Sequence, residues 1–205
     1  MRILLLGKYF NQKKNQYNFL KRIIPKPSIE FIDEFEKIPR KIKKFDIALS
    51  YGYGRILNDY EIKKIKCRII NCHIGYLPFA RGIYPLLWSL VFKKNLGVTF
   101  HLIEDSQIDC GRILYKKKIK FSKRDNLKLL QRKCIDMINK ELNDNFKILL
   151  NKNLFLKKKH SHYYFNRKVS TGAVKLLPNK WNTTVDYIQK NRNILKNFFL
   201  EHHVK

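Results

Sequence analysis

The chain has 205 residues, and its 44 Lys and Arg against 16 Asp and Glu give a formal net charge of +28. A hydrophobic content of 44% and an aromatic content of 13% suffice for a packed core, which argues against a disordered chain or a disulfide-built miniprotein. The length fits one domain of ordinary size, with or without a short appendage.

The large positive charge has two interpretations. A dense Lys and Arg surface binds phosphate with little regard to sequence, so nucleic acid is a possible partner. The Lys residues are spread from Lys8 to Lys205 rather than gathered in one segment. This spread favours ordinary solvated charge, with attraction of a polyanionic ligand as the alternative.

The chain contains four cysteines, Cys67, Cys72, Cys110 and Cys134. They form no CxxC pair and have no zinc-ligand spacing, so we expect reduced thiols, with Cys72 as a small buried hydrophobe. The pairs His160/His162 and His202/His203 have no accompanying thiol or carboxylate pattern, so no metal site is expected. The opening apolar run is too short for a signal peptide, and no apolar stretch reaches roughly 18 residues, which predicts a cytoplasmic protein.

Strand and helix patterns alternate in the first part of the chain. Ile3 to Leu6 is a short apolar run ended by Gly7, as expected for a strand buried on both faces of a parallel sheet. Similar runs follow at Ser28–Ile32, Asp46–Ser50 and Arg68–Asn71. Apolar residues at helical spacing between Asp59 and Ile65 predict a helix with Asp59 as a possible N-cap. The alternation predicts an α/β fold with a Rossmann-like, mostly parallel sheet flanked by helices.

The middle of the chain predicts two helices and two strands. A short helix is expected from Tyr84 to Phe92, followed by strands at Gly97–Ile103 and Arg112–Phe121. The loop between these strands, Glu104–Gly111, is polar and acidic. From Ser122 to about Leu149, apolar residues recur every three or four positions, which predicts the longest helix.

The last 50 residues differ in character. Tyr163–Phe165 and Ala173–Leu177 flank turn-prone residues, which predicts a β-hairpin within His160–Leu177, and a final helix is expected from Thr183 to Phe199. We therefore expect a catalytic core at residues 1–155 and a hairpin and helix appendage at 156–205. An isolated hairpin is marginally stable and leaves unpaired edges, so this segment also predicts a homodimer.

Polar side chains follow the strand that begins at Arg68. Asn71 and His73 come where this strand leaves the sheet, and residues two apart on an extended segment point to the same side. Ligands bind open parallel sheets beyond the carboxyl ends of their strands. An amide donor and an imidazole are therefore expected to face one site.

Three ordered sequence motifs contain these residues or follow them. The run N-C-H-x-G-Y-L-P-x-x-R-G-x-x-P-x-x-W-S starts at Asn71, G-V-T-x-H starts at Gly97, and D-x-G-x-I-L starts at Asp109. Together they resemble the folate-dependent formyltransferases that use 10-formyltetrahydrofolate. The close match covers about Asn71 to Leu114. Gly75 departs from the family, which often has Ser or Thr there, so no ligand contact is assigned to that position.

The resemblance implies that Asn71, His73 and Asp109 are the catalytic residues. When an amine attacks a formyl carbon, the Asn71 amide and a protonated His73 could stabilise the tetrahedral intermediate. Asp109 could orient the imidazole and accept a proton from the attacking nitrogen. Without the resemblance, Asp109 would read as a turn residue. His101 is predicted to be structural.

The resemblance also implies the ligand contacts. The residues expected to contact the folate cosubstrate are Tyr53, Arg81, Gly82, Asp105 and Ile108. The residues expected to contact the other substrate are Lys8, Asn11, Tyr84 and Trp88, although packing is the alternative role for Trp88. The alternative for Tyr53 is also packing, and Arg81 could instead brace a loop carbonyl.

Three branches of the family are considered, and two of them have features that this sequence lacks. A methionyl-tRNA formyltransferase resembles this core followed by a further C-terminal domain. The roughly 55 residues that follow the predicted long helix in this sequence are too few for such a domain. A glycinamide ribonucleotide enzyme would carry a Gly-rich phosphate loop after the first strand, where this chain has Lys8-Tyr9-Phe10-Asn11-Gln12. The sugar N-formyltransferases remain, with a nucleotide-linked amino sugar for a surface glycan as the substrate. The alternatives are a methionyl-tRNA enzyme or an inactive basic module that binds nucleic acid.

Overall fold

The structure is a computed structural model that describes residues 1–10, 18–79, 81–151 and 164–203. The chain divides into two compact units, each built from three stretches of sequence. The first comprises Met1–His73, Thr99–Tyr115 and Ile138–Lys158, and the second comprises Ile74–Val98, Lys116–Met137 and Lys159–Lys205. The predicted boundary between residues 155 and 156 lies outside the described residues and stays a prediction.

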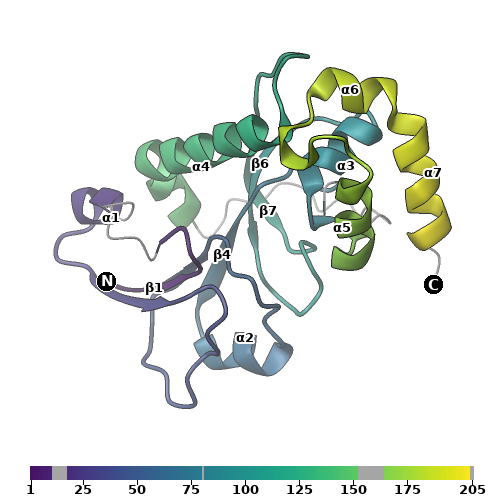
Figure 1. Cartoon of the computed structure of the whole chain (residues 1–205). Coiled ribbons are helices and arrows are strands. Elements are labelled where there is room, and N and C mark those ends of the chain that lie inside the picture. Colours follow the sequence, from purple (N-terminus) through teal and green to yellow (C-terminus); the bar gives the residue numbers. More distant parts are fainter. Residues whose placement is uncertain (11–17, 80, 152–163, 204–205) are drawn as a thin grey trace. The chain divides into compact units, whose positions relative to one another are not determined.

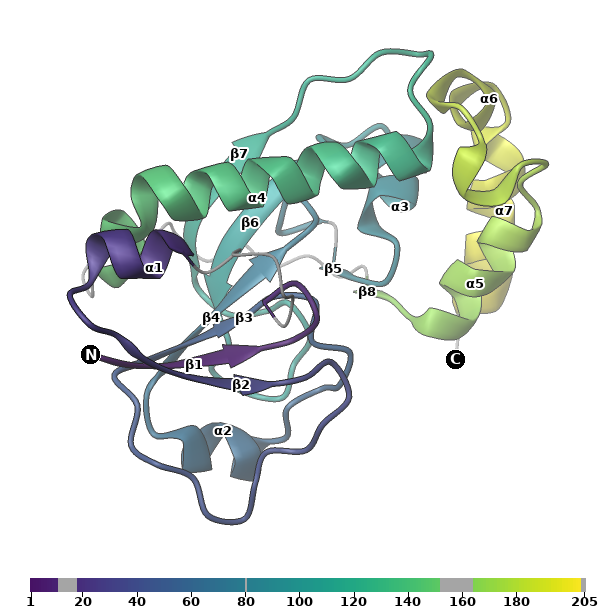
Figure 2. The same ribbon diagram turned by 60° about the vertical axis from the view of Figure 1, so that its left-hand side comes forward.

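Six strands form one sheet (Figures 1 and 2). They are β1 (Arg2–Leu6), β2 (Ser28–Ile32), β3 (Ile47–Ser50), β4 (Arg68–His73), β6 (Gly97–Leu102) and β7 (Ile113–Lys118), in the spatial order β2-β1-β3-β4-β6-β7. Strand β1 pairs in parallel with β2 and β3, and β3 pairs in parallel with β4. Strand β4 pairs antiparallel with β6. The predicted mostly parallel, Rossmann-like sheet is confirmed.

Burial on both faces explains the unbroken apolar sequence of β1. Leu4 and Leu6 pack into a hydrophobic cluster with Ile65 and Ile69, and Ile3 and Leu5 are also fully buried. Successive side chains of a strand point to opposite faces, so both faces of β1 need cover. Helix α2 (Asp59–Ile65) lies on one face of the sheet, and α1 (Asn18–Ile23) and the second half of α4 (Leu127–Leu150) lie on the other (Figures 1 and 2).

The start of α2 differs from the prediction by one residue. Asn58 is the N-cap, because its side chain accepts a hydrogen bond from Glu61 N at 2.9 Å. The Glu61 carboxylate in turn accepts from Asn58 N at 3.2 Å, which completes a capping box. Asp59 is the first helical residue, where its negative charge favours the helix dipole.

The second unit is built from short elements around an aromatic core. Besides the parts of β6, β7 and α4 that fall within it, the second unit contains β5 (Arg81–Gly82), α3 (Pro85–Val91), β8 (Tyr164–Phe165), α5 (Arg167–Lys175), the 3-10 helix η1 (Lys180–Asn182), α6 (Val185–Lys190) and α7 (Arg192–His203). The Trp88 ring stacks on Phe165 with centroids 4.9 Å apart and packs against Phe199 at 5.2 Å. All three side chains are fully buried.

The predicted β-hairpin is wrong. Tyr164 and Phe165 form β8, but β8 pairs in parallel with Arg81 and Gly82 of β5, and the expected second strand lies largely in helix α5. Asn166 caps α5 by accepting a hydrogen bond from Val169 N at 2.9 Å. The buried residues of α5 are Val169, Ser170, Ala173 and Val174, and their spacing places them on one face of a helix. Residues 160–163 lie outside the described part of the chain.

Two helix boundaries also change. The expected final helix from Thr183 to Phe199 is two helices, α6 and α7, and Thr184 caps α6 by accepting from Tyr187 N at 3.3 Å. The long helix begins at Leu127 rather than Ser122, because Ser122 N bonds to the Asp125 carboxylate at 3.1 Å in a turn that precedes it.

The thiols behave as expected from the sequence. All four cysteines are free, and Cys72 and Cys134 are buried. Burial raises the pKa of the Cys67 thiol to about 11 and that of Cys134 to about 12, so both stay protonated at neutral pH. Among the described residues, no helix has the length and apolar content to cross a membrane.

Candidate active site

The antiparallel pairing of β4 with β6 gathers four side chains on one face of the sheet. Asn71 lies opposite His101, and His73 lies opposite Thr99. Residues directly opposite each other, and those two apart on one strand, share a face. Asn71 and His73 thus meet His101 at the carboxyl end of β4, as the sequence predicts for the first two.

Asp109 forms a compact polar cluster with Asn71, His73 and His101. Its Oδ1 lies 3.5 Å from His73 Nδ1, 3.3 Å from His101 Nε2 and 3.5 Å from Asn71 Nδ2. Its side chain, like that of His73, is about nine-tenths buried. Two imidazoles and an amide therefore surround a single, largely desolvated carboxylate.

The backbone of Asp109 is unusual. Its φ of +51° lies in the left-handed region, which costs a residue with a Cβ roughly 1–2 kcal/mol. Asp and Asn tolerate this region better than most residues, which agrees with the turn reading of this position. Asp109 is thus both a turn residue and a member of the polar cluster, so the two interpretations of this position are compatible.

His101 is the site residue that the sequence interpretation missed. Its ring is 2% exposed, its Nδ1 lies 2.8 Å from Leu102 O, and its Nε2 lies 3.1 Å from Asn71 Nδ2. With Nδ1 donating to the carbonyl, a neutral Nε2 accepts from Asn71, whereas a protonated Nε2 donates to Asp109. The available signal was the spacing of G-V-T-x-H, which places His101 opposite Asn71 once β4 and β6 are paired antiparallel.

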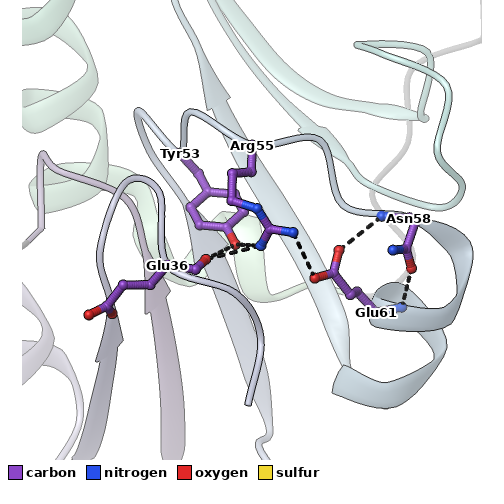
Figure 3. A network of polar contacts seen from close by, with 5 residues as sticks. All are labelled: Glu36, Tyr53, Arg55, Asn58 and Glu61. Carbon is purple, nitrogen blue, oxygen red and sulfur yellow. Dashed lines mark hydrogen bonds and ion pairs between the residues drawn. The ribbon is translucent and has the colours of Figure 1, made fainter. Parts of the chain in front are cut away.

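Tyr53 belongs to a polar network at the ends of β2 and β3 (Figure 3). Its hydroxyl donates to Glu36 O at 2.6 Å and accepts from Arg55 Nη1 at 3.0 Å, and Arg55 Nη2 lies 3.2 Å from the Glu61 carboxylate. Burial raises the pKa of Tyr53, so its hydroxyl keeps its proton for this bond. The network ties the loop after β3 to helix α2, and the predicted folate contact of Tyr53 stays a prediction.

Lys8 follows β1 at the same edge of the sheet. Its Nζ forms an ion pair with Glu34 at 2.8 Å and lies 5.6 Å from the centre of the Tyr9 ring. Gly7 before it has a φ of +104°, and an added Cβ would lie 2.5 Å from Tyr51 O. The loops after β1, β2 and β3 therefore lie close together. Asn11, the other predicted substrate contact of this loop, lies outside the described residues.

The predicted folate residues of the loop between β6 and β7 are part of an ordered turn. Asp105 Oδ1 accepts a hydrogen bond from Gln107 N at 2.9 Å, and Ile108 is half-buried. These positions precede Asp109 directly, so a ligand that contacts them would lie beside the polar cluster.

The remaining predicted contacts belong to the second unit. Gly82 has a φ of +88°, and an added Cβ would lie 2.4 Å from Phe165 O, so the pairing of β5 with β8 requires glycine there. Arg81 is half-buried in β5. Tyr84 caps α3 in the left-handed conformation and meets the Trp181 ring edge-on at 4.8 Å.

Trp88 has a packing role. Its ring is 0% exposed, and its Nε1 donates to Ser170 Oγ at 2.9 Å, which in turn donates to Ile83 O at 3.0 Å. The expected substrate contact at Trp88 is therefore corrected, since no surface of the ring is available to a ligand.

The cluster has the groups that acyl transfer to an amine requires. Asn71 and protonated histidine nitrogens are donors for an oxygen that becomes negative, and Asp109 is an acceptor for a proton. Among the described residues, no group of His, Cys, Asp and Glu is arranged to hold a metal ion.

Comparison with known proteins places this cluster in a family. Residues 11–144 match the model of the formyl transferase family. A dTDP-4-amino-4,6-dideoxyglucose formyltransferase of Mycobacterium bovis is 28% identical over 92 residues, which cover 45% of this chain and 38% of that protein. A methionyl-tRNA formyltransferase of Prochlorococcus marinus is 34% identical over 93 residues, covering 45% and 28% respectively. The chain thus matches well under half the length of these curated relatives.

A solved structure matches over nearly its whole length. The formyltransferase PseJ from Anoxybacillus kamchatkensis, in complex with UDP-4,6-dideoxy-4-formamido-L-AltNAc and tetrahydrofolate, has a TM-score of 0.79 and 28% identity. The match covers 92% of this chain and 97% of that one. Since the family model spans well over half of the sequence and includes all four residues of the polar cluster, the chain belongs to the formyl transferase family.

Proposed function

We propose that this protein transfers the formyl group of 10-formyltetrahydrofolate to the amine of a nucleotide-linked amino sugar. The observation that carries the proposal is the match to PseJ over 92% of the chain, because that structure holds tetrahydrofolate and a formylated UDP-sugar. The geometry of Asn71, His73 and Asp109 supports the same reaction.

The chemistry follows from the polar cluster. The sugar amine attacks the formyl carbon, a new C–N bond forms, and the bond from that carbon to the folate nitrogen breaks. Asn71 Nδ2 and a protonated His73 donate hydrogen bonds to the oxygen on which negative charge develops. Asp109 accepts the proton that the attacking nitrogen loses, directly or through water, and the folate nitrogen gains a proton as its bond to the formyl carbon breaks, so that no net proton is released. His101 and His73 both lie within 3.5 Å of Asp109 Oδ1 and hold that carboxylate beside the reacting atoms.

The residues present fit a folate cosubstrate. The donor set of Asn71 and His73 suits a carbonyl oxygen, and the turn at Asp105–Ile108 offers backbone groups beside Asp109. We propose Tyr53, Asp105, Ile108, Arg81 and Gly82 as residues that contact the folate cosubstrate. Lys8, Asn11 and Tyr84 are the proposed contacts of the sugar nucleotide.

A surface glycan is the proposed destination of the formylated sugar, and the cytoplasm the proposed location of the enzyme. A homodimer is also proposed. Its basis is a set of exposed apolar side chains on α5 and α7, since the expected hairpin is absent from the described residues. Leu176 at the end of α5 is 47% exposed, and Ile194 and Leu200 of α7 are 62% and 47% exposed. Light scattering near physiological ionic strength tests this, because a monomer mass at every micromolar concentration would contradict the dimer.

Methionyl-tRNA formylation is the second candidate, favoured by the 34% identity to the Prochlorococcus enzyme. The two functions are separated by incubating the protein and 10-formyltetrahydrofolate with a panel of UDP- and dTDP-linked amino sugars and with methionyl-tRNA. We expect a mass gain of one formyl group on an amino sugar and none on the tRNA. Formylation of the tRNA alone would contradict the proposal, and salt-sensitive RNA binding without turnover would favour an inactive nucleic-acid module.

A further inference from the structure

The loop that carries Asp109 is fastened to its surroundings on both sides of that residue. On the downstream side, the Glu104 carboxylate accepts from Arg112 N at 2.9 Å and from Arg112 Nε at 2.7 Å. Gly111 passes so close to β6 that an added Cβ would lie 1.8 Å from Leu102 O. These contacts fix the base of the loop against the end of β6.

On the upstream side, a different element holds the loop. Ser106 N donates to Asp59 Oδ1 at 2.8 Å, across 47 residues of sequence. Asp59 is the first residue of α2, and its neighbours Asn58 and Glu61 form the capping box of that helix. Glu61 is in turn paired with Arg55, so the helix end that carries Asp59 is itself held in place (Figure 3).

We propose that Asp59 is a positioning residue that holds Asp109 beside His73 and Asn71 through the Ser106 tether. This inference rests on the proposed function, in which Asp109 accepts the proton of the amine. Asp59 touches neither ligand in this proposal. It acts only through the two residues that lie between Ser106 and Asp109, Gln107 and Ile108.

Backbone energetics give the reason for a tether at this place. A left-handed Asp109 is a conformation that the free loop would leave readily, so neighbouring contacts must select it. The loop between Glu104 and Arg112 has its ends closed by the Glu104 contacts, and the bond to Asp59 fixes a point between those ends. One such exposed hydrogen bond contributes a modest free energy, and we expect its loss to lower kcat roughly three- to tenfold.

The first experiment does not depend on activity. Asp59→Ala removes the acceptor, whereas Asp59→Asn keeps an Oδ1 that can accept from Ser106 N. Asp144→Ala is the matched control, since it removes an exposed carboxylate from α4 that pairs only locally with Lys140 in an i,i+4 contact. In NMR spectra without ligands, we expect Asp59→Ala alone to speed hydrogen exchange at Ser106 N and to shift the ring signals of His73 and His101.

The second experiment measures turnover of the same four proteins with 10-formyltetrahydrofolate and the accepted amino sugar. We expect kcat to fall roughly three- to tenfold in Asp59→Ala, with recovery in Asp59→Asn and no change in Asp144→Ala. Thermal unfolding of each variant separates this effect from a loss of folded protein.

Three outcomes would overturn the proposal. They are wild-type ring signals in Asp59→Ala, faster exchange at Ser106 with unchanged kcat, or an equal loss in Asp59→Asn and Asp59→Ala. If the wild-type protein formylates no amino sugar, the proposed function fails, and the ring signals still decide whether Asp59 holds Asp109 in place.

Discussion

Asn71 and Trp88 belong to one continuous sequence motif, yet the structure gives them opposite roles. Asn71 lies near the carboxyl end of strand β4, with its amide nitrogen 3.1 Å from His101 Nε2 and 3.5 Å from Asp109 Oδ1, in a cluster of polar groups. Trp88 is fully buried among Phe92, Phe165 and Phe199, and its polar atom is bound by Ser170. A motif therefore mixes residues that act on a ligand with residues that build the core, and only their surroundings tell them apart.

The largest expected effect is on stability and concerns Trp88. Trp88→Ala should lower the free energy of unfolding by about 3–5 kcal/mol, because it leaves a cavity against Phe165 and removes the indole donor to Ser170 Oγ. Urea unfolding measures this. Trp88→Phe should cost less and keep turnover per folded molecule. A stable Trp88→Ala protein without turnover would instead make Trp88 a substrate contact.

His73 should show the opposite behaviour. His73→Ala removes a donor to the developing negative charge, so turnover should fall about 10²–10³-fold while the unfolding midpoint changes little. Asn71→Ala and Asp109→Ala should behave alike. If folded His73→Ala protein turns over near the wild-type rate, the polar cluster is not the catalytic site, and the contrast with Trp88 is wrong.

His101 should fall between these extremes, because it contacts Asp109 but is 2% exposed. His101→Ala should lower kcat roughly tenfold and leave KM for the amino sugar nearly unchanged, since the histidine orients the carboxylate rather than the substrate. Steady-state kinetics of the folded variant measures both constants. A rise in KM with unchanged kcat would assign His101 to substrate binding.

Asp125 provides a pH test within the second unit. Its hydrogen bonds with Lys133, at 2.5 Å, and with Ser122 lower the pKa of the carboxyl in the folded protein. A depressed folded pKa contributes stability that is fully present above the unfolded value of 3.8 and is lost as pH falls through the folded pKa. Urea midpoints should therefore fall less between pH 6 and pH 3 in Asp125→Asn than in the wild-type protein. Equal slopes would show that other carboxylates dominate.

The smallest effect is expected at Tyr53. Tyr53→Phe removes the hydrogen bond to Glu36 O, and the ring keeps its place, so the free energy of unfolding should fall by about 1 kcal/mol. Turnover at saturating folate should stay close to that of the wild-type protein. A raised KM for folate alone would support a direct contact between Tyr53 and the cosubstrate.

The sequence was most informative where local pattern and burial agree. Short apolar runs such as Ile3–Leu6 predicted buried parallel strands because both faces of those strands are covered. It misled at Ala173–Leu177, where apolar residues suit either a strand or one face of a helix. There the Asn166 cap and the buried positions of α5 decide for the helix.

By itself, the sequence determined the α/β class, the strand that delivers Asn71 and His73, and the motif that ties the chain to the formyltransferases. Only the tertiary structure decided that His101 joins the site, that Trp88 does not, and that Asp59 reaches the loop of Asp109. The reason is physical. Spacing along the chain fixes which residues share one strand or helix face, whereas contacts across 30 or 47 residues depend on which strands pair and where each loop is held.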